Sequence, residues 1–418
     1  MPISNLNNSR IFNACQGVLY RKRQSTTSGG TDNSAGTMDV LRGVQSIGVD
    51  SSFPRTPYTD LGRFQQEYGS YGKQEFSITI DRVLDGGNDD IGYGRPFYYP
   101  VGSPSAYKTS HLLDSSNLGA DGFSGTLRNY DICIVYSDDE AAYLGDPKGN
   151  QKFSSATYRS CLLTSVDYSF AVDGPIRESL SFTTGVATMN DITGLGSVTW
   201  GTPTASPPTP VGFQPPAMLL TRRHLDSLEW KLPEEVEDMF DMGKTKKEGA
   251  FGPNLPVIGL QSIELGMTID YMDLFDNGEF GGARGDRTKQ NFMKQIVLPV
   301  GVTASFTGVV ADTYKGRAST DWELNDQNFA GGTGNLSLYK TNREIALYTK
   351  ALGEDNTTRY ISWLLGKKNY LTSLSFGGGD ASGGGNVEAT LSYQNDHSDF
   401  VVFQDTTLYA NPTATEIY

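Results

Sequence analysis

The chain has 418 residues, enough for two or three domains that each bury a core of their own. It carries 34 Lys and Arg against 48 Asp and Glu, and the net charge of −14 argues against a broad surface that neutralises nucleic-acid phosphates. Residues 1–20 lack the pattern of a secretion signal, and no apolar run approaches the roughly eighteen residues of a membrane span, so we expect a soluble protein made in a cytoplasm.

The composition favours β structure. The chain has 48 Gly, 22 Tyr and 20 Phe, a mixture typical of strands joined by glycine-rich turns. The cysteines, Cys15, Cys133 and Cys161, are odd in number, which does not describe a disulfide framework. Cys133 and Cys161 lie in apolar strand patterns, so we expect both to be buried as small hydrophobic residues.

Residues 1–40 form the first segment and contain a basic run, Arg21-Lys22-Arg23, before a tract of Ser, Thr and Gly. This composition predicts an N-terminal arm or long loop. Alternating and β-branched residues then predict strands over 76–80 and 131–136. Two period-two runs on either side of Asp173-Gly174 predict a hairpin, because that dipeptide tolerates positive φ.

The second half opens after a stretch rich in Pro, Thr and Ser, residues 202–216, which predicts a linker. A short helix is expected over 233–240, where Pro and acidic residues occupy the first turn. A second helix is expected over 357–367, because Tyr360, Ile361, Leu364 and Leu365 share one helical face. Strands over 370–376 and 387–393 follow, and residues 411–418 are expected to form a C-terminal tail.

The two halves repeat each other in order. Gly43-Val44-Gln45-Ser46-Ile47 in the first half matches Gly259-Leu260-Gln261-Ser262-Ile263 in the second. The segments around Tyr136, Leu163 and Glu178 then recur, in the same order and at nearly constant separation, around Tyr348, Leu371 and Glu388. Four matches in one order indicate duplication. We therefore expect one β domain over 41–200, a linker and helical insert over 201–245, and a second β domain over 246–410.

Two long polar stretches occupy corresponding places in the halves, residues 51–74 and 276–290. Each follows the Gln-Ser-Ile motif and precedes an apolar strand, so each is expected to be a long hairpin tip or an extended surface loop. Loops of this length in compact domains are usually functional or disordered.

We find no catalytic, cofactor-binding or metal-binding motif. His111, His224 and His397 lack ligand spacing, and no Gly-x-Ser-x-Gly is present. The acidic stretches at 85–90 and 276–279 lack the full calcium-loop pattern. We interpret them as acidic turns and expect no enzyme activity.

The strand-turn-strand at 161–182 resembles that of bacteriophage tail-tube proteins, and residues 259–265 and 298–308 look similar. The resemblance implies two tandem β-sandwich domains, each with a flanking helix, for which 357–367 would serve in the second half. It also implies sheets that join between neighbours around a tube, and loops that reach the next ring. The candidate contacts between rings on those loops are Arg55, Tyr58, Arg63, Glu279, Arg284, Asp286 and Arg287.

The resemblance further implies the partners. They are copies of the chain itself, with a trimer of pseudo-sixfold symmetry favoured over a hexamer, and other tail proteins. Genome DNA would pass through a negatively charged lumen without specific binding, because like charges repel. The expected location is the tail of a virion, with no membrane partner.

Two other functions remain open at this point. One is a different β assembly protein, such as a capsid, baseplate or surface-layer component. The other is a carbohydrate-active enzyme on a β scaffold, since fold alone does not separate these functions. Hollow tubes in electron micrographs would distinguish the tube protein, and a deep pocket with converging carboxylates would favour the enzyme.

Overall fold

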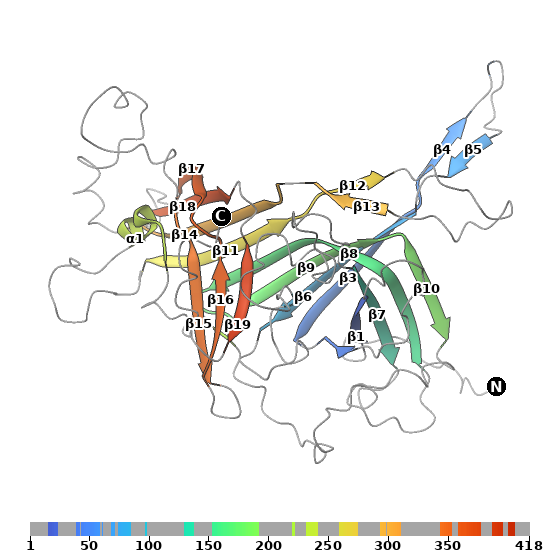
Figure 1. Cartoon of the computed structure of the whole chain (residues 1–418), viewed down its shortest axis with the longest axis horizontal. Helices are drawn as coiled ribbons and strands as arrows, with labels where there is room; N and C mark the ends of the chain where they lie inside the picture. Colours follow the sequence, from blue (N-terminus) through green and yellow to red (C-terminus); the bar gives the residue numbers. More distant parts are fainter. Residues whose placement is uncertain are drawn as a thin grey trace, which may run out of the picture.

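The computed structural model describes the parts of the chain that form strands, their connections and one helix (Figure 1). The described residues are 16–23, 39–41, 43–58, 61, 68–71, 74–84, 97, 129–137, 153–191, 220–221, 231–240, 259–274, 293–297, 299–310, 343–352, 358–377, 387–395 and 400–405. They are mainly β and pair in antiparallel sheets, as the composition predicted.

A long antiparallel sheet runs through the molecule and contains strands from both halves of the chain. Along its main axis the order is β3-β6-β9-β8-β11-β14-β18-β17, which makes eight strands. Their bounds are β3 Val44–Ser52, β6 Glu75–Val83, β8 Phe153–Ala171, β9 Arg177–Thr184, β11 Leu260–Thr268, β14 Gly301–Val309, β17 Asn369–Gly377 and β18 Glu388–Asn395. The sheet therefore joins the two expected domains instead of separating them.

Strand order repeats within this sheet. We call β3-β6-β9-β8 the first group and β11-β14-β18-β17 the second group. In each group the Gln-Ser-Ile strand is outermost on one side and a hairpin strand is outermost on the other. The ladder between the first two strands is irregular between Val44 and Ser46 in one group and between Leu260 and Ser262 in the other. The last two strands are irregular after Leu163 and after Leu371.

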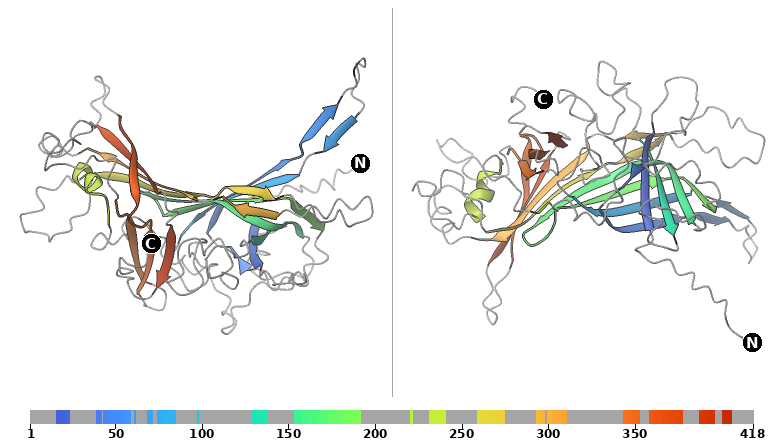
Figure 2. Two further views of the ribbon diagram at one scale, coloured as in Figure 1. Left: turned by 45° about the horizontal axis from the view of Figure 1, so that its top comes forward. Right: turned by 90° about the horizontal axis from the view of Figure 1, so that it is seen from below.

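Two smaller sheets lie on the same side of the long sheet (Figure 2, left). The first half of β8 leaves the long sheet and pairs with β7 (Asn129–Ser137) on one side and β10 (Val186–Asp191) on the other. In the second half of the chain, β16 (Thr358–Leu364) pairs with β15 (Ala346–Leu352) and β19 (Val401–Asp405). Positive φ values of 54° at Ser160 and 68° at Gly366 mark the turn from one sheet to the other.

The prediction of a helix over 357–367 is wrong, because this segment contains the central strand β16 of the second small sheet. Its residues are buried on both faces, with Ile361 and Trp363 on one and Ser362 and Leu364 on the other. A strand covered on both sides has a continuous apolar run, which also fits one face of a helix. Among the described residues the only helix is α1 (Glu234–Phe240), which lies where the sequence predicted it.

The other strand predictions are confirmed. β6 and β7 cover the runs at 76–80 and 131–136, β8 and β9 form the predicted hairpin, and β17 and β18 form its counterpart. Cys133 and Cys161 are buried, as expected. The linker expected over 202–216 and the tail over 411–418 lie outside the described residues.

Part of the segment expected to be an arm belongs to a sheet. β1 (Gln16–Arg23) pairs with β7 over its whole length and with β2 (Asp39–Val40) at Leu19 and Tyr20. Val18, Leu19 and Tyr20 are buried, so the strand is held by packing as well as by hydrogen bonds.

Two glycines, Gly43 and Gly259, occupy corresponding positions immediately before the first strand of each group. The N–H of Val83 donates to the carbonyl of Gly43 over 2.9 Å, and that of Val309 donates to the carbonyl of Gly259 over 2.8 Å. A Cβ on Gly43 would lie 2.4 Å from the Val83 carbonyl oxygen, and one on Gly259 would lie 2.5 Å from that of Val309. The repeated Gly at the start of the motif thus reflects a close approach of two backbones.

Aromatic packing connects the groups across the core. Trp363 of β16 is fully buried and meets Phe170 edge-on, with ring centroids 5.0 Å apart, and Tyr168 at 5.9 Å. Phe170 and Tyr168 belong to β8, so the small sheet of the second half packs on the last strand of the first group. One hydrophobic cluster accordingly spans both halves.

Candidate functional site

The most informative contact is the one between the two groups, which we call the internal seam. Residues 165–171 of β8 pair antiparallel with residues 262–268 of β11, from Ser165 opposite Thr268 to Ala171 opposite Ser262. This is one edge strand of the first group paired with one edge strand of the second. The internal seam therefore shows how an edge of this kind is completed by another group of the same strand order.

Side chains on the core side of the internal seam are fully covered. Tyr168 and Leu265, which face each other across it, are each 1% exposed, and Val166 and Ile263 are also buried. The hydroxyl of Tyr271 donates to the carbonyl of Leu163 over 2.6 Å and extends the contact past the ladder. Burial of this apolar surface adds to the backbone hydrogen bonds in holding the groups together.

The other side of the internal seam is polar and tightly fitted. Asp167 lies opposite Gly266, and a Cβ on Gly266 would stand 2.6 Å from Oδ1 of Asp167. Burial raises the pKa of the Asp167 carboxyl, and the negative charge of Glu264 on the adjacent strand adds to the rise. The glycine thus leaves room for a carboxylate that the seam partly desolvates.

The same sheet leaves two edges open. Within the described residues, β3 pairs with β6 on one side only, and β17 pairs with β18 on one side only apart from the bridge between Asn369 and Arg343. Because the sheet is continuous, these edges lie at its opposite ends (Figure 1). A row of backbone N–H and C=O groups at such an edge is a template for another strand.

One face of the eight-stranded sheet is open and hydroxyl-rich, and we call it the open face. Its residues alternate with the buried ones along each strand, for example Ser77 and Thr79 between Phe76, Ile78 and Ile80. The hydroxyl side chains on it include Ser46, Ser52, Ser77, Thr79, Ser165, Ser169, Ser179, Ser181, Ser262, Thr268, Thr303, Ser305, Thr307, Ser373, Ser375, Thr390 and Ser392. Small polar side chains therefore dominate this face, to which the apolar residues Ala171 and Val309 also belong.

The charge of the open face is negative. Its charged side chains among the described residues of these strands are the basic Arg177 and the acidic Asp50, Glu75, Asp81, Asp167, Glu264 and Glu388. Asp81 is held by hydroxyls: Ser179 donates to Oδ1 over 2.6 Å and Ser46 donates to Oδ2 over 2.7 Å. These hydrogen bonds, that from Ser179 first, lower the pKa of Asp81, so its charge is stabilised.

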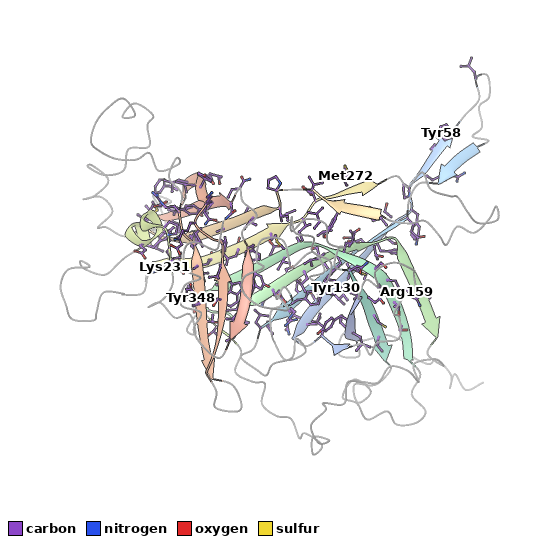
Figure 3. All side chains as sticks on the ribbon, in the orientation of Figure 1. Tyr58, Tyr130, Arg159, Lys231, Met272 and Tyr348 are labelled. Atoms are coloured by element: carbon purple, nitrogen blue, oxygen red, sulfur yellow. The ribbon has the colours of Figure 1, made fainter. Side chains whose placement is uncertain are left out.

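The predicted contacts between rings are described only in part. Arg55 and Tyr58 lie at the two ends of β4 (Arg55–Tyr58), which pairs with β5 (Tyr68–Tyr71) in a hairpin that projects from the sheet (Figure 3). Both side chains are exposed, Tyr58 by 55%. Arg63 and the four residues on the second loop, Glu279, Arg284, Asp286 and Arg287, lie outside the described residues.

A second hairpin stands in the corresponding place of the second half. β12 (Tyr271–Leu274) pairs with β13 (Met293–Ile296), and the loop at 276–290 lies between them in the chain. Met272 on β12 is 53% exposed (Figure 3). The sequence predicted a hairpin tip or an extended loop at 51–74, and the described strands there form a hairpin.

The buried charges have partners that explain them structurally. Nε of Arg82 lies 3.2 Å from Oε2 of Glu178, with both side chains fully buried. Nε of Arg343 lies 2.6 Å from Oε1 of Glu235, which joins α1 to the segment before β15. In the part of the chain that the structure describes, no three His, Cys, Asp or Glu residues gather as they would around a metal ion.

Sequence reasoning identified the strands at both open edges but not that they are edges. Only the order of strands in the sheet makes Val49 and Phe376 exposed edge residues.

No helix among the described residues is long and apolar enough to cross a membrane.

Comparisons with known proteins give weak likenesses. The chain matches no protein-family model and no curated protein. Among solved structures it is similar to the tube-terminating cap of the anti-feeding prophage, with 11% identity, a TM-score of 0.25, and coverage of 44% of this chain and 91% of that chain. It is also similar to a chain of the PVC sheath-tube complex of an extracellular contractile injection system in the extended state, with 11% identity, a TM-score of 0.26, and coverage of 44% and 95%. At these TM-scores the description of the fold depends on the strand pairings alone.

Proposed function

We propose that this protein is a structural subunit that assembles with its own copies into rings stacked as a tube, in the tail of a bacteriophage. The observation that carries the proposal is the internal seam. There, the first and second groups, which share the same strand order, pair edge to edge. The two outer strands, β3 and β17, correspond to the two strands that pair at the internal seam, β11 and β8. The groups are interpreted as copies of one sandwich domain.

Head-to-tail pairing of this sort generates a closed ring or an open filament, depending on the rotation between neighbours. In this chain one contact of this kind is already present within the molecule, between the first and second groups. It sets the rotation from one group to the next. Three chains would place six groups around an axis, which is the pseudo-sixfold trimer that the resemblance implies. Closure also removes the exposed edges, which are otherwise an aggregation hazard.

The open face is proposed to line the lumen. It carries six carboxylates against one guanidinium among the described residues of its strands, and its remaining side chains are mostly hydroxyls. DNA phosphates would be repelled by such a wall, so the genome would pass without binding. The small sheets lie on the opposite side and would face outward (Figure 2).

The two hairpins are proposed to contact the next ring. The β4-β5 hairpin projects well beyond the long sheet at the end away from α1 (Figure 1). Arg55, Tyr58 and Arg63, and on the second loop Glu279, Arg284, Asp286 and Arg287, remain the proposed contacts. Other tail proteins would meet the first and last rings, and no catalytic role is proposed.

Electron microscopy of the purified full-length protein tests the proposal. Hollow tubes or stacked rings, with a matching rise in mass by analytical ultracentrifugation, are expected as the concentration is raised. Closed shells or flat sheets would instead favour a capsid or surface-layer component. A chain that stays monomeric at every concentration and salt would overturn the assembly itself.

A further inference from the structure

The internal seam predicts which residues meet when two copies of the chain join. β3 corresponds to β11, with Ser46 matching Ser262, since both residues follow the same irregularity in their ladders. β17 corresponds to β8, with Leu371 matching Leu163, since both residues precede the same irregularity. The two open edges are therefore the counterparts of the two strands that pair inside the chain.

Exposure differs sharply between the counterparts. Leu265 at the internal seam is 1% exposed, whereas Val49, its counterpart on β3, is 36% exposed. Tyr168 is 1% exposed, whereas Phe376, its counterpart on β17, is 52% exposed. These two open positions are apolar, and their counterparts are the residues that face each other across the internal seam.

The same contrast continues past the ladder. Ile269 is 2% exposed and its N–H donates to the carbonyl of Thr164 over 2.8 Å. Its counterpart Phe53 is 63% exposed. The edge of β3 thus presents apolar side chains where the internal seam covers them, which is the pattern of a surface that is covered by a partner.

Apart from their ladder irregularities, the open strands carry few of the features that protect an edge. β3 reads VQSIGVDSS and holds one charged residue, Asp50, while β17 reads NYLTSLSFG and holds none. Neither contains Lys or Pro, the residues that natural edges use against unwanted pairing. These edges are therefore compatible with addition of another strand.

We infer that β17 of one copy pairs antiparallel with β3 of the next copy in the register of the internal seam. The occupant of each edge is a second copy of this chain, and the inference rests on the proposed function. Replacing each residue of the internal seam by its counterpart places Val49 opposite Phe376 and Asp50 opposite Ser375, as Leu265 faces Tyr168 and Gly266 faces Asp167. Ser52 then lies opposite Ser373.

The chemistry of the new pairs suits this register. Val49 and Phe376 point to the core side and would cover each other, because a β-branched residue and an aromatic ring form a favourable cross-strand pair. Gly48 would face Gly377 where Glu264 faces Ser169 inside the chain. The seam between copies therefore has no counterpart of the acidic contact between Asp167 and Glu264. This seam would carry less charge than the internal seam.

Cysteine pairing in the full-length chain tests the register. The N–H of Val172 donates to the carbonyl of Gln261, and that of Ile269 to Thr164, which makes these the hydrogen-bonded pairs of the internal ladder. Pairs alternate, so Gly266 and Asp167 form a non-hydrogen-bonded pair, in which Cα atoms are about 4.5 Å apart. The corresponding pair, Asp50→Cys with Ser375→Cys, is within disulfide range.

The matched control moves one cysteine by two residues on the same face. Asp50→Cys with Ser373→Cys has the same number of added thiols, but its Cα atoms lie diagonally, about 7 to 8 Å apart, outside the usual disulfide range. After mild oxidation of assembled particles, we expect reducible multimers in denaturing gels from the first variant. The control and the unsubstituted chain should give at least tenfold less.

The outcomes separate the two proposals. Tubes that form but crosslink equally in both variants, or only in the control, would overturn the register and leave the proposed function standing. A purified chain that never assembles would overturn both. Crosslinking of the first variant alone supports the inference.

A second variant covers the case in which the added cysteines themselves prevent assembly. Phe376→Asp places a charge on a side chain that is exposed in the single chain, so its thermal melt should be unchanged while assembled particles fall at least tenfold. Val387→Asp is the control, because Val387 is 48% exposed and lies outside the inferred contact. Equal assembly of both variants would contradict the inference.

Discussion

Replacement of Glu178 by Gln is expected to destabilise the fold strongly, because Glu178 and Arg82 form an ion pair in which neither side chain is exposed. Oε2 of Glu178 lies 3.2 Å from Nε of Arg82. Its Oε1 accepts from the hydroxyl of Tyr168 and from the N–H of Phe97, each over 2.7 Å. The amide oxygen of Gln would still accept these two hydrogen bonds, but its NH2 group would then face Nε of Arg82, so the substitution removes both the negative charge and the acceptor opposite the guanidinium.

Removing one partner of a buried ion pair costs about 3 to 5 kcal/mol, since the other charge stays desolvated. For domains of this size, 1 kcal/mol shifts the melting temperature by roughly 2 to 4 °C, so a fall of roughly 6 to 20 °C is expected. The second group has Gly308 and Ala389 in the register positions of Arg82 and Glu178 and folds without such a pair. Arg82→Met combined with Glu178→Gln should therefore recover at least half of the loss.

Thermal and urea unfolding followed by circular dichroism measures these changes. Glu388→Gln makes the same chemical change at an exposed residue of β18 and should stay within about 0.5 kcal/mol. A loss below about 1 kcal/mol in Glu178→Gln, or a double variant less stable than the single one, would refute the reasoning.

Three further outcomes are expected. Gly259→Ala should cost about 1 to 3 kcal/mol in urea unfolding, because its Cβ would meet a carbonyl oxygen at 2.5 Å, whereas Gly48→Ala, with nothing within 4 Å, should be near neutral; equal effects would argue against the close approach. Burial raises the pKa of Asp167, so its charge opposes folding above that pKa, and Asp167→Asn should stabilise the chain at neutral pH and lose this advantage below the ordinary value of 3.8, as urea unfolding at both pH values would show. Deletion of residues 276–290 should leave soluble, folded protein but impair polymerisation in electron micrographs, and loss of the soluble protein would count against a role between rings.

Local patterns were enough to locate several strands, namely β6, β7, β8, β9, β17 and β18. The hairpin of β8 and β9 followed from alternation around Asp173-Gly174, and the pair β17 and β18 followed from the repeat. The prediction failed at β16, where a helix was expected. This strand is buried on both faces, and its continuous apolar run has no period of two. The basic run at 21–23 likewise gave no sign that β1 pairs with β7, since pairing depends on residues more than a hundred positions away.

The candidate site was only partly accessible in this way. Arg55 and Tyr58 were expected on a projecting loop, and both are exposed on the β4-β5 hairpin. The open edges were not expected at particular residues, because an edge is defined by the absence of a neighbour. Val49 has an ordinary strand environment in the sequence, and its exposure follows from where β3 lies in the sheet.

The amino-acid sequence by itself determined that the chain is mainly β, that its two halves run through the same motifs in the same order, and that its net charge is negative. These properties are local or additive, so they need no knowledge of which segments touch. Only the tertiary structure decided that β8 and β11 join the halves into one sheet and that β3 and β17 are its open ends. Strand neighbours are chosen by the packing of side chains far apart in the chain, and that choice determines which backbone groups remain available to another copy.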